Sequence, residues 1–171
     1  MTIHSGHPFL EPPSGRDPVR RLRGRLGGAV TLWATGAEEA RAALTVSSVL
    51  VAAGEPARLL GLLDPDSDLA AAVASTGTAV VALLQWRHRD LADAFAGVAP
   101  APGGPFRLGS WSQTPWGPLL DGVSAWAGVR FPGPARQVGW SGLYDGVLEH
   151  VEVLAEDAPL VHRRGRYVRP D

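Results

Sequence analysis

The sequence predicts a mainly β fold, a small barrel with a few short peripheral helices. Short apolar or alternating segments recur along the 171 residues, and 21 glycines and 15 prolines separate them, a pattern typical of strands joined by turns. Helical periodicity is confined to a few short segments, so the longer alternating helices of a doubly wound sheet are missing. Hydrophobic residues make up 45% and charged residues 19% of the chain, which indicates one ordinary globular domain.

The chain is expected to begin with an extended N-terminal arm over residues 1–15, which hold three prolines and two glycines without periodicity. The domain is then expected to span residues 16–171. Its first helix follows Asp17-Pro18, an N-cap residue with proline at the first helical position. Apolar residues at helical spacing give this helix one apolar face, arginines occupy the others, and Gly27-Gly28 ends it.

Three strands separated by glycine-containing turns come next. They are expected over residues 29–35, 42–51 and 58–63. The middle strand contains Thr45-Val46-Ser47-Ser48 and is expected to break near its centre.

The centre of the chain alternates between helix and strand signals. Residues 64–68, with three aspartates and a serine, predict a helix start, and Gly77 ends that helix. An apolar strand is expected over residues 78–85 and a short helix over residues 89–96. Residues 97–118 show no periodicity, but they carry tryptophans, which favours a functional segment over a disordered one.

The last third of the chain predicts further strands. Residues 123–131 alternate, with Val123, Ala127 and Val129 on one face and Trp126 on the other. Residues 137–154 are expected to form two strands joined near Gly142 or Gly146, and residues 160–168 to close the domain.

Composition excludes several kinds of chemistry. There is no cysteine, lysine or asparagine, so thiolate sites, Schiff bases and Cys-His-Asn triads are impossible. The histidines are scattered, and no metal site is expected. The net charge of −1 predicts no nucleic-acid partner, and no apolar run reaches membrane-spanning length. The first residues lack a signal-peptide pattern, so we expect a soluble, cytoplasmic protein.

The order of the segments resembles the flavin reductase-like family. The resemblance runs from about Asp17 to the C-terminus and is carried by an ordered set of short motifs. These are Gly28-Ala29-Val30-Thr31, Leu44-Thr45-Val46-Ser47-Ser48-Val49, Glu55-Pro56, Leu63-Asp64-Pro65 with Ser67, Gly77-Thr78 with the apolar run after it, Leu91 to Gly97, Pro118-Leu119-Leu120, Pro159-Leu160 and Arg164-Gly165-Arg166-Tyr167.

The resemblance implies a split β-barrel, Greek-key-like, that binds FMN or FAD and transfers hydride to it from NADH or NADPH. Bound flavin carries this redox chemistry, so no catalytic residue is expected, and the absence of Gly-x-Gly-x-x-Gly fits a nicotinamide that stacks on the flavin. It also implies a homodimer and, as a possible partner, a flavin-dependent monooxygenase. Six tryptophans exceed what so small a core needs, and aromatic side chains are enriched at interfaces, so Trp111, Trp116, Trp126 and Trp140 are the interface candidates.

The resemblance also assigns candidate contacts. The flavin contacts are expected at Thr45, Val46, Ser47, Ser48, Leu63, Asp64, Ser67, Gln85, Trp86 and Arg87. An interrupted strand leaves backbone amides free for the flavin ring, while Ser67 and Arg87 suit its phosphate. Relatives often carry Gly-Asp-His where this chain has Gly139-Trp140-Ser141, so Trp140 and Ser141 are the candidate substrate contacts.

Each local pattern also has a plainer interpretation. Residues 45–48 can be an ordinary strand, Ser67 a simple N-cap, Arg87 a solvated side chain and Trp140 a packing residue. Because the Gly-Asp-His histidine is missing, a flavin carrier or sensor without efficient NAD(P)H turnover remains the alternative to a reductase. The third hypothesis is a structural subunit that binds no flavin.

Overall fold

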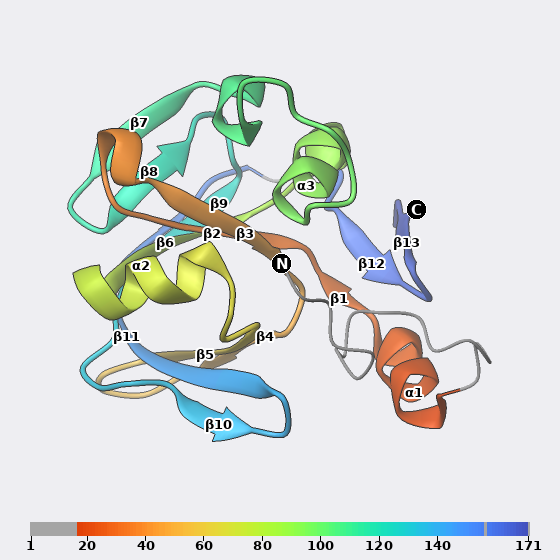
Figure 1. The fold of residues 1–171 in the computed structure, drawn as a ribbon, viewed down its shortest axis with the longest axis horizontal. Helices are drawn as coiled ribbons and strands as arrows, with labels where there is room; N and C mark the ends of the chain where they lie inside the picture. Colours follow the sequence, from red (N-terminus) through yellow and green to blue (C-terminus); the bar gives the residue numbers. More distant parts are fainter. Residues whose placement is uncertain (1–16, 156, 171) are drawn as a thin grey trace.

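The computed structural model describes residues 17–155 and 157–170 (Figure 1). The arm expected over residues 1–15 lies outside the described residues. Within the described part, most strands form one eight-stranded antiparallel sheet in the order β3-β2-β6-β9-β11-β5-β4, with β10 paired to β11. The strands are β2 (Thr31–Thr35), β3 (Ala42–Val46), β4 (Val49–Ala52), β5 (Arg58–Leu63), β6 (Thr78–Leu83), β9 (Ala125–Arg130), β10 (Arg136–Val138) and β11 (Ser141–Val153).

The sheet curls because its two edge strands are neighbours in the chain. β3 and β4 lie at opposite ends of the strand order, yet only Ser47 and Ser48 separate them. The sheet edges therefore meet at this two-residue corner and form a barrel that is split between β3 and β4. This confirms the expected mainly β barrel and places the break in the second strand where the sequence predicted it.

The expected joint near Gly142 or Gly146 is wrong. The turn lies at Gly139-Trp140, and β11 continues through both glycines. β11 pairs with β5 through its first half and with β9 through its second half, with an irregularity between Leu148 and His150. A Cβ on Gly146 would lie 2.3 Å from Val129 Cγ1, so this glycine serves close packing rather than a turn.

The described residues contain three short α-helices. α2 (Asp68–Thr76) and α3 (Arg89–Phe95) pack against the barrel, whereas α1 (Pro18–Leu26) lies beside β12 (Val161–Arg163) (Figure 1). Asp17 caps α1 by accepting the Val19 amide at 3.0 Å, and Ser67 caps α2 by accepting the Ala70 amide at 3.1 Å. α1 departs from expectation, because its apolar residues face outward and Leu22 is 62% exposed.

The segment over residues 97–118 is more regular than the sequence indicates. It contains a 3-10 turn, η3 (Pro105–Leu108), and a hairpin of β7 (Trp111–Thr114) and β8 (Gly117–Leu120). The Trp111 indole donates to the Phe106 carbonyl at 2.8 Å and packs against the Phe95 and Phe106 rings. The tryptophan that suggested function therefore stabilises this segment against α3.

A small three-stranded sheet lies beside the barrel. β1 (Gly28–Ala29) pairs with β12 (Val161–Arg163), and β12 pairs with β13 (Arg166–Val168). The strand expected over residues 29–35 is thus divided at Val30 between this sheet and β2. The segment expected over residues 160–168 is a hairpin that turns at Arg164-Gly165.

The buried side chains form two clusters. One fills the barrel around Trp33, whose indole donates at 3.1 Å to the Thr31 hydroxyl, which donates in turn to the Val46 carbonyl at 2.6 Å. The other lies between the sheet and α3 and includes Leu32, Leu84 and Phe95. No helix in the described residues is long and apolar enough to cross a membrane.

Candidate functional site

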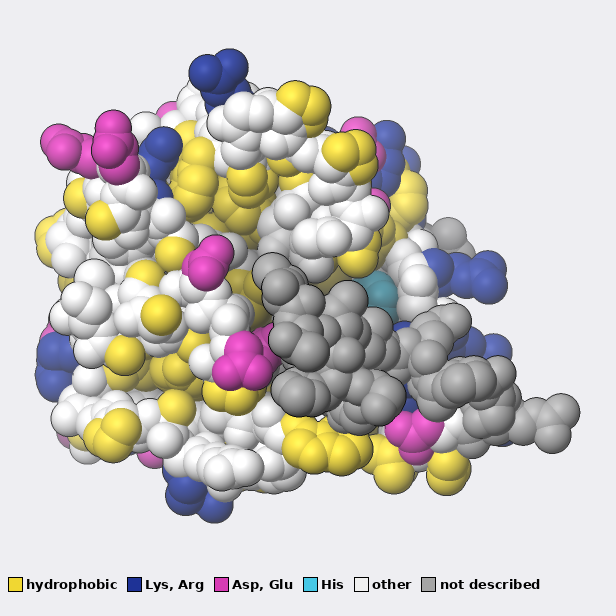
Figure 2. All heavy atoms as spheres, in the orientation of Figure 1, with side chains coloured by type: hydrophobic (Ala, Val, Ile, Leu, Met, Phe, Trp, Pro, Cys, Tyr) yellow, Lys and Arg dark blue, Asp and Glu magenta, His cyan; other side chains and the backbone are white. Residues whose placement is uncertain are grey.

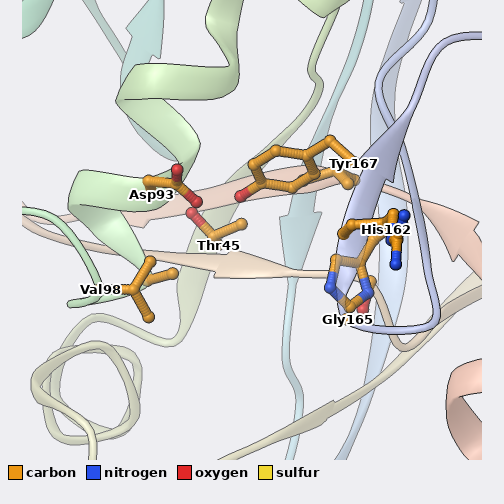
Figure 3. Close-up of a pocket in the computed structure, with 10 residues that line it drawn as sticks. Thr45, Asp93, Val98, His162, Gly165 and Tyr167 are labelled. Atoms are coloured by element: carbon orange, nitrogen blue, oxygen red, sulfur yellow. The ribbon is translucent and has the colours of Figure 1, made fainter.

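A pocket of about 390 Å³ lies between the corner of the barrel, α3 and the β12–β13 hairpin (Figure 3). Two of its lining residues, Thr45 and Ser47, belong to the run that the sequence singled out. The complete lining is Val30, Thr45, Ser47, Asp93, Ala96, Val98, His162, Gly165, Arg166 and Tyr167. The pocket thus joins segments from the start, middle and end of the chain.

The corner carries free backbone hydrogen-bond donors, and of its two serines Ser47 lines the pocket whereas Ser48 does not. Ser48 leads into β4: its hydroxyl donates to the Leu62 carbonyl at 2.7 Å, and its carbonyl accepts the Leu62 amide at 3.1 Å. Among the described residues, the amides of Ser47 and Ser48 donate to no carbonyl. Thr45 fixes the other side of the corner, because its hydroxyl donates at 2.6 Å to the Ala92 carbonyl of α3. The corner therefore offers amides held in place by both neighbouring elements.

Asp93 and Tyr167 form the polar wall of the pocket. The Tyr167 hydroxyl faces the Asp93 carboxylate, and Figure 3 shows both groups converging with Thr45. Burial first, and then the hydrogen-bonding environment and charge of Asp93, hold the pKa of Tyr167 well above its usual value. The phenol therefore stays protonated at physiological pH.

His162 lies on the hairpin side of the same pocket. Burial lowers the pKa of this imidazole, the nearby Arg23 lowers it further, and Asp93 opposes the shift. Its ring contacts Tyr167 edge to face, with 5.9 Å between the centroids. A neutral imidazole at neutral pH follows, so the pocket has an uncharged aromatic wall facing its carboxylate.

A second group of predicted residues gathers at the end of β5. Leu63 is buried in the barrel core, and Asp64 begins the turn into α2. The Ser67 hydroxyl donates to the Asp64 carbonyl at 2.7 Å as well as capping α2, and the Asp64 carboxylate accepts the Asp66 amide at 2.9 Å. These contacts account for Ser67 as an N-cap, and none of these residues lines the pocket.

Val46 lies between the two groups, but its side chain is buried in the barrel core. It can reach a ligand only through its backbone.

The Gln85, Trp86 and Arg87 side chains form a third group beyond the pocket. Gln85 is 3% exposed, and its side-chain oxygen has no hydrogen-bond partner among the described residues. Its backbone amide donates to His88 Nδ1 at 3.1 Å. Arg87 donates to the Gly122 carbonyl, and the Arg89 guanidinium lies over the Trp86 ring, 5.4 Å from its centroid. Arg87 and Trp86 are thus engaged within the protein.

Trp140 and Ser141 lie at the turn between β10 and β11, outside the pocket lining. Trp140 is 69% exposed. Ser141 precedes Gly142, which pairs with Leu63, so this turn adjoins the second group at the end of β5.

Sequence reasoning missed the polar wall and the hairpin side of the pocket. Asp93 is half-buried on α3 and Tyr167 lies on β13, so only the tertiary fold brings them together. The motif Arg164-Gly165-Arg166-Tyr167 contributed to the family resemblance, but no role in the site was predicted for it. Within the described residues, no group of three or more histidine, aspartate or glutamate side chains could hold a metal ion.

These features define the class as a split β-barrel with a polar pocket where its sheet edges meet. A family model, described as flavin reductase like domain, matches residues 23–170, and the chain belongs to this family. It is also 35% identical over 113 residues to the FMN reductase (NADH) RutF of Ancylobacter novellus. That match covers 66% of this chain and 62% of RutF, less than two thirds of the relative's length.

Two solved structures share the fold. BorF, the flavin reductase component of a bacterial two-component tryptophan halogenase, has a TM-score of 0.78 at 21% identity, with 90% of this chain and 97% of BorF covered. The NADH:FAD oxidoreductase SgcE6 of Streptomyces globisporus has a TM-score of 0.80 at 20% identity, with 95% and 96% covered.

Proposed function

We propose that the protein is a flavin reductase that transfers hydride from NADH or NADPH to FMN or FAD. Family membership and the similarity to an FMN reductase (NADH) support this activity. The structural observation that carries it is the pair of unpartnered amides at Ser47 and Ser48, held at the barrel corner beside the pocket. We also propose a cytoplasmic location, where the reductant is produced.

The residues present fit a flavin. A flavin ring carries carbonyl oxygens and a ring nitrogen that accept hydrogen bonds, and bound flavin supplies the position that accepts hydride. The Ser47 and Ser48 amides supply donors to such acceptors, and Thr45 keeps the corner rigid through α3. Val30 and Val98 contribute apolar surface to the pocket, on which a flavin ring can pack. Binding and orientation are the work of this chain, and no side chain is required as an acid or base.

A flavin titration with added NADH tests the activity. We expect the fluorescence of FMN to change on binding, and the visible absorption band of oxidised flavin to disappear rapidly when NADH is added without oxygen. If no flavin binds, the proposal fails and the structural-subunit reading takes its place.

A flavin carrier or sensor is the second candidate, and one observation favours it. By the family resemblance, the stretch Gly139-Trp140-Ser141 stands where members often carry Gly-Asp-His, and Trp140 is exposed at a turn. Bound FMN that stays oxidised with excess NADH, and is reduced by dithionite, would identify a carrier.

We further propose a homodimer that supplies reduced flavin to a monooxygenase. The outer face of β4, β5, β11 and β10 carries exposed Leu50, Leu62 and Val138, which the strand register places on one side of the sheet. A second copy would cover this face. The tryptophans expected at the interface are otherwise engaged: Trp111 packs on Phe106, while Trp116 and Trp126 pack on His150. Trp140 remains available.

A further inference from the structure

Half of the positive charge of this chain gathers in one small unit beside the pocket. Seven of its sixteen arginines lie in α1 and the β12–β13 hairpin, and an eighth, Arg169, follows the hairpin directly. Neither segment contains an acidic residue, and Asp17 precedes α1 as its N-cap. We call this unit the arginine platform. It comprises Arg20, Arg21, Arg23, Arg25, Arg163, Arg164, Arg166 and Arg169. Since the whole chain has a net charge of −1, the platform is a strong local exception.

The fold brings the two halves of the platform together. The Arg164 amide donates to the Gly24 carbonyl of α1 at 2.8 Å, and β1, which follows α1, pairs with β12 through Gly28 and His162. Figure 1 shows α1 beside the β12–β13 hairpin, and Figure 2 shows arginine side chains at this edge of the molecule. The fold thus places the arginines of both ends of the domain side by side.

The arrangement works against folding. Arg163 and Arg166 lie directly opposite each other across the hairpin, and Arg21 and Arg25 are one helical turn apart, so each pair repels. Arg164 has a φ of 53°, a conformation that favours glycine. Within residues 17–155 and 157–170, the side chains of Arg21, Arg25, Arg163, Arg164, Arg166 and Arg169 form no hydrogen bond or ion pair. An anionic ligand would relieve this repulsion.

The platform continues into the pocket. Arg166 and His162 line it together with Thr45 and Ser47, and Arg23 is close enough to His162 to lower its pKa. When a phosphorylated ligand occupies the pocket, its phosphate groups can therefore lie beside the arginines at the pocket edge. Guanidinium groups bind phosphate oxygens through paired hydrogen bonds, which suits a ligand with several such oxygens.

We propose that the arginine platform binds the phosphate groups of the nucleotide that enters the pocket. This rests on the proposed function and deepens it. The phosphates belong either to the nicotinamide dinucleotide or to the flavin, and Ser67 at the N-terminus of α2 is the competing site for the flavin phosphate. The sequence lacks the Gly-x-Gly-x-x-Gly motif that binds a dinucleotide diphosphate at the N-terminus of a helix. In this proposal the arginine guanidinium groups bind the diphosphate instead.

The double variants Arg163→Gln/Arg164→Gln and Arg21→Gln/Arg25→Gln test the proposal. The matched control is Arg107→Gln, an exposed arginine on η3 outside the platform. Reduction is measured with NADH, with NADPH and with N-benzyl-dihydronicotinamide, a hydride donor without phosphates. We expect the ratio of kcat/KM for NADH to that for the phosphate-free donor to fall about tenfold in each double variant. The fall should be larger for NADPH, and the control should keep the wild-type ratio.

Equilibrium binding distinguishes the dinucleotide phosphates from the flavin phosphate. Because it requires no turnover, its result does not depend on whether the protein is a reductase. Titrations use NADP⁺ by calorimetry, and FMN against riboflavin by fluorescence. Weaker binding of NADP⁺ assigns the platform to the dinucleotide, and weaker binding of FMN but not of riboflavin assigns it to the flavin phosphate; either result supports the proposal. Unchanged binding of both phosphorylated ligands in folded variants overturns it, whether or not the wild type turns over NADH. A wild type that binds FMN but no dinucleotide, with FMN unaffected by the variants, overturns both the platform and the reductase.

Discussion

At the scale of single residues, the barrel core depends on places where only a hydrogen atom fits. A Cβ on Gly61 of β5 would lie 2.5 Å from the Trp33 ring, and Trp33 is fully buried. The ring cannot move without disturbing its hydrogen bond to Thr31. Gly61 is therefore a packing residue, in the middle of a strand where glycine is otherwise unfavourable.

Gly61→Ala should lower the free energy of unfolding by about 1–3 kcal/mol, the usual range for overpacking a core. Urea unfolding followed by tryptophan fluorescence measures the change. Gly133→Ala is the matched control, because a Cβ there meets nothing within 4 Å. Equal effects of the two substitutions would contradict the packing argument.

His88 makes the stability of the molecule depend on pH. Its Nδ1 accepts the Gln85 amide at 3.1 Å, and burial, followed by the charge of Arg87, lowers its pKa below the usual 6.5. The unfolded chain therefore binds the proton first as pH falls. The free energy of unfolding should be level above about pH 6.5 and should fall below it.

His88→Gln should flatten this dependence, since a glutamine oxygen accepts the same amide without titrating. Urea midpoints of both proteins at several pH values measure the effect. His162 also has a lowered pKa, but it is present in both proteins and cancels in the comparison. Parallel pH profiles would show that His88 is not the group responsible.

At the scale of elements, the sequence predicted most boundaries because local signals set them. Residues 58–63 form β5 as expected, and the caps at Asp17 and Ser67 begin α1 and α2. The β7–β8 hairpin was missed because its sequence has no strong periodic pattern. It is stabilised instead by the pairing of β7 with β8 and by the contact of Trp111 with Phe95 of α3. The misplaced joint in β11 has a similar cause: Gly146 looks like a turn residue locally, but it is required by the approach of Val129.

The candidate site was predictable only in its local part. The Thr45 to Ser48 run is continuous in the sequence, and its break follows from a strand that must turn a corner. Asp93 and Tyr167 join it through the packing of α3 and β13 against that corner, and no local pattern encodes contacts between segments so far apart in the chain.

The α2 N-terminus allows a test that separates a cap from a phosphate site. Ser67→Ala should cost about 1 kcal/mol of stability through loss of the cap, whereas Ser67→Asp should retain it, because aspartate caps helices equally well. If the flavin phosphate binds here, Ser67→Asp should weaken FMN binding and leave riboflavin binding unchanged, since the added carboxylate repels phosphate. Fluorescence titration gives both affinities. Unchanged FMN affinity would show that the phosphate does not bind at Ser67.

At the scale of the whole molecule, the proposed dimer uses the face of the sheet that the helices leave uncovered. Leu50 on β4 is 69% exposed on this face. Leu50→Asp should shift a dimer toward monomer, because a carboxylate cannot be buried there without a partner. Sedimentation velocity at micromolar concentration measures the change, and Leu108→Asp, on η3, serves as the control. A wild-type protein that sediments as a monomer would refute the homodimer.

The pairing of β5 with β11 has a consequence for the newborn chain. Residues 58–63 find their partners at residues 142–147, so a ribosome must translate past residue 147 before the barrel can close. Until then the growing polypeptide exposes an apolar strand edge, the kind of surface that chaperones protect. Fragments that stop short of residue 141 should consequently stay unfolded. The barrel should fold in one cooperative step after β11 has been synthesised, rather than strand by strand during translation.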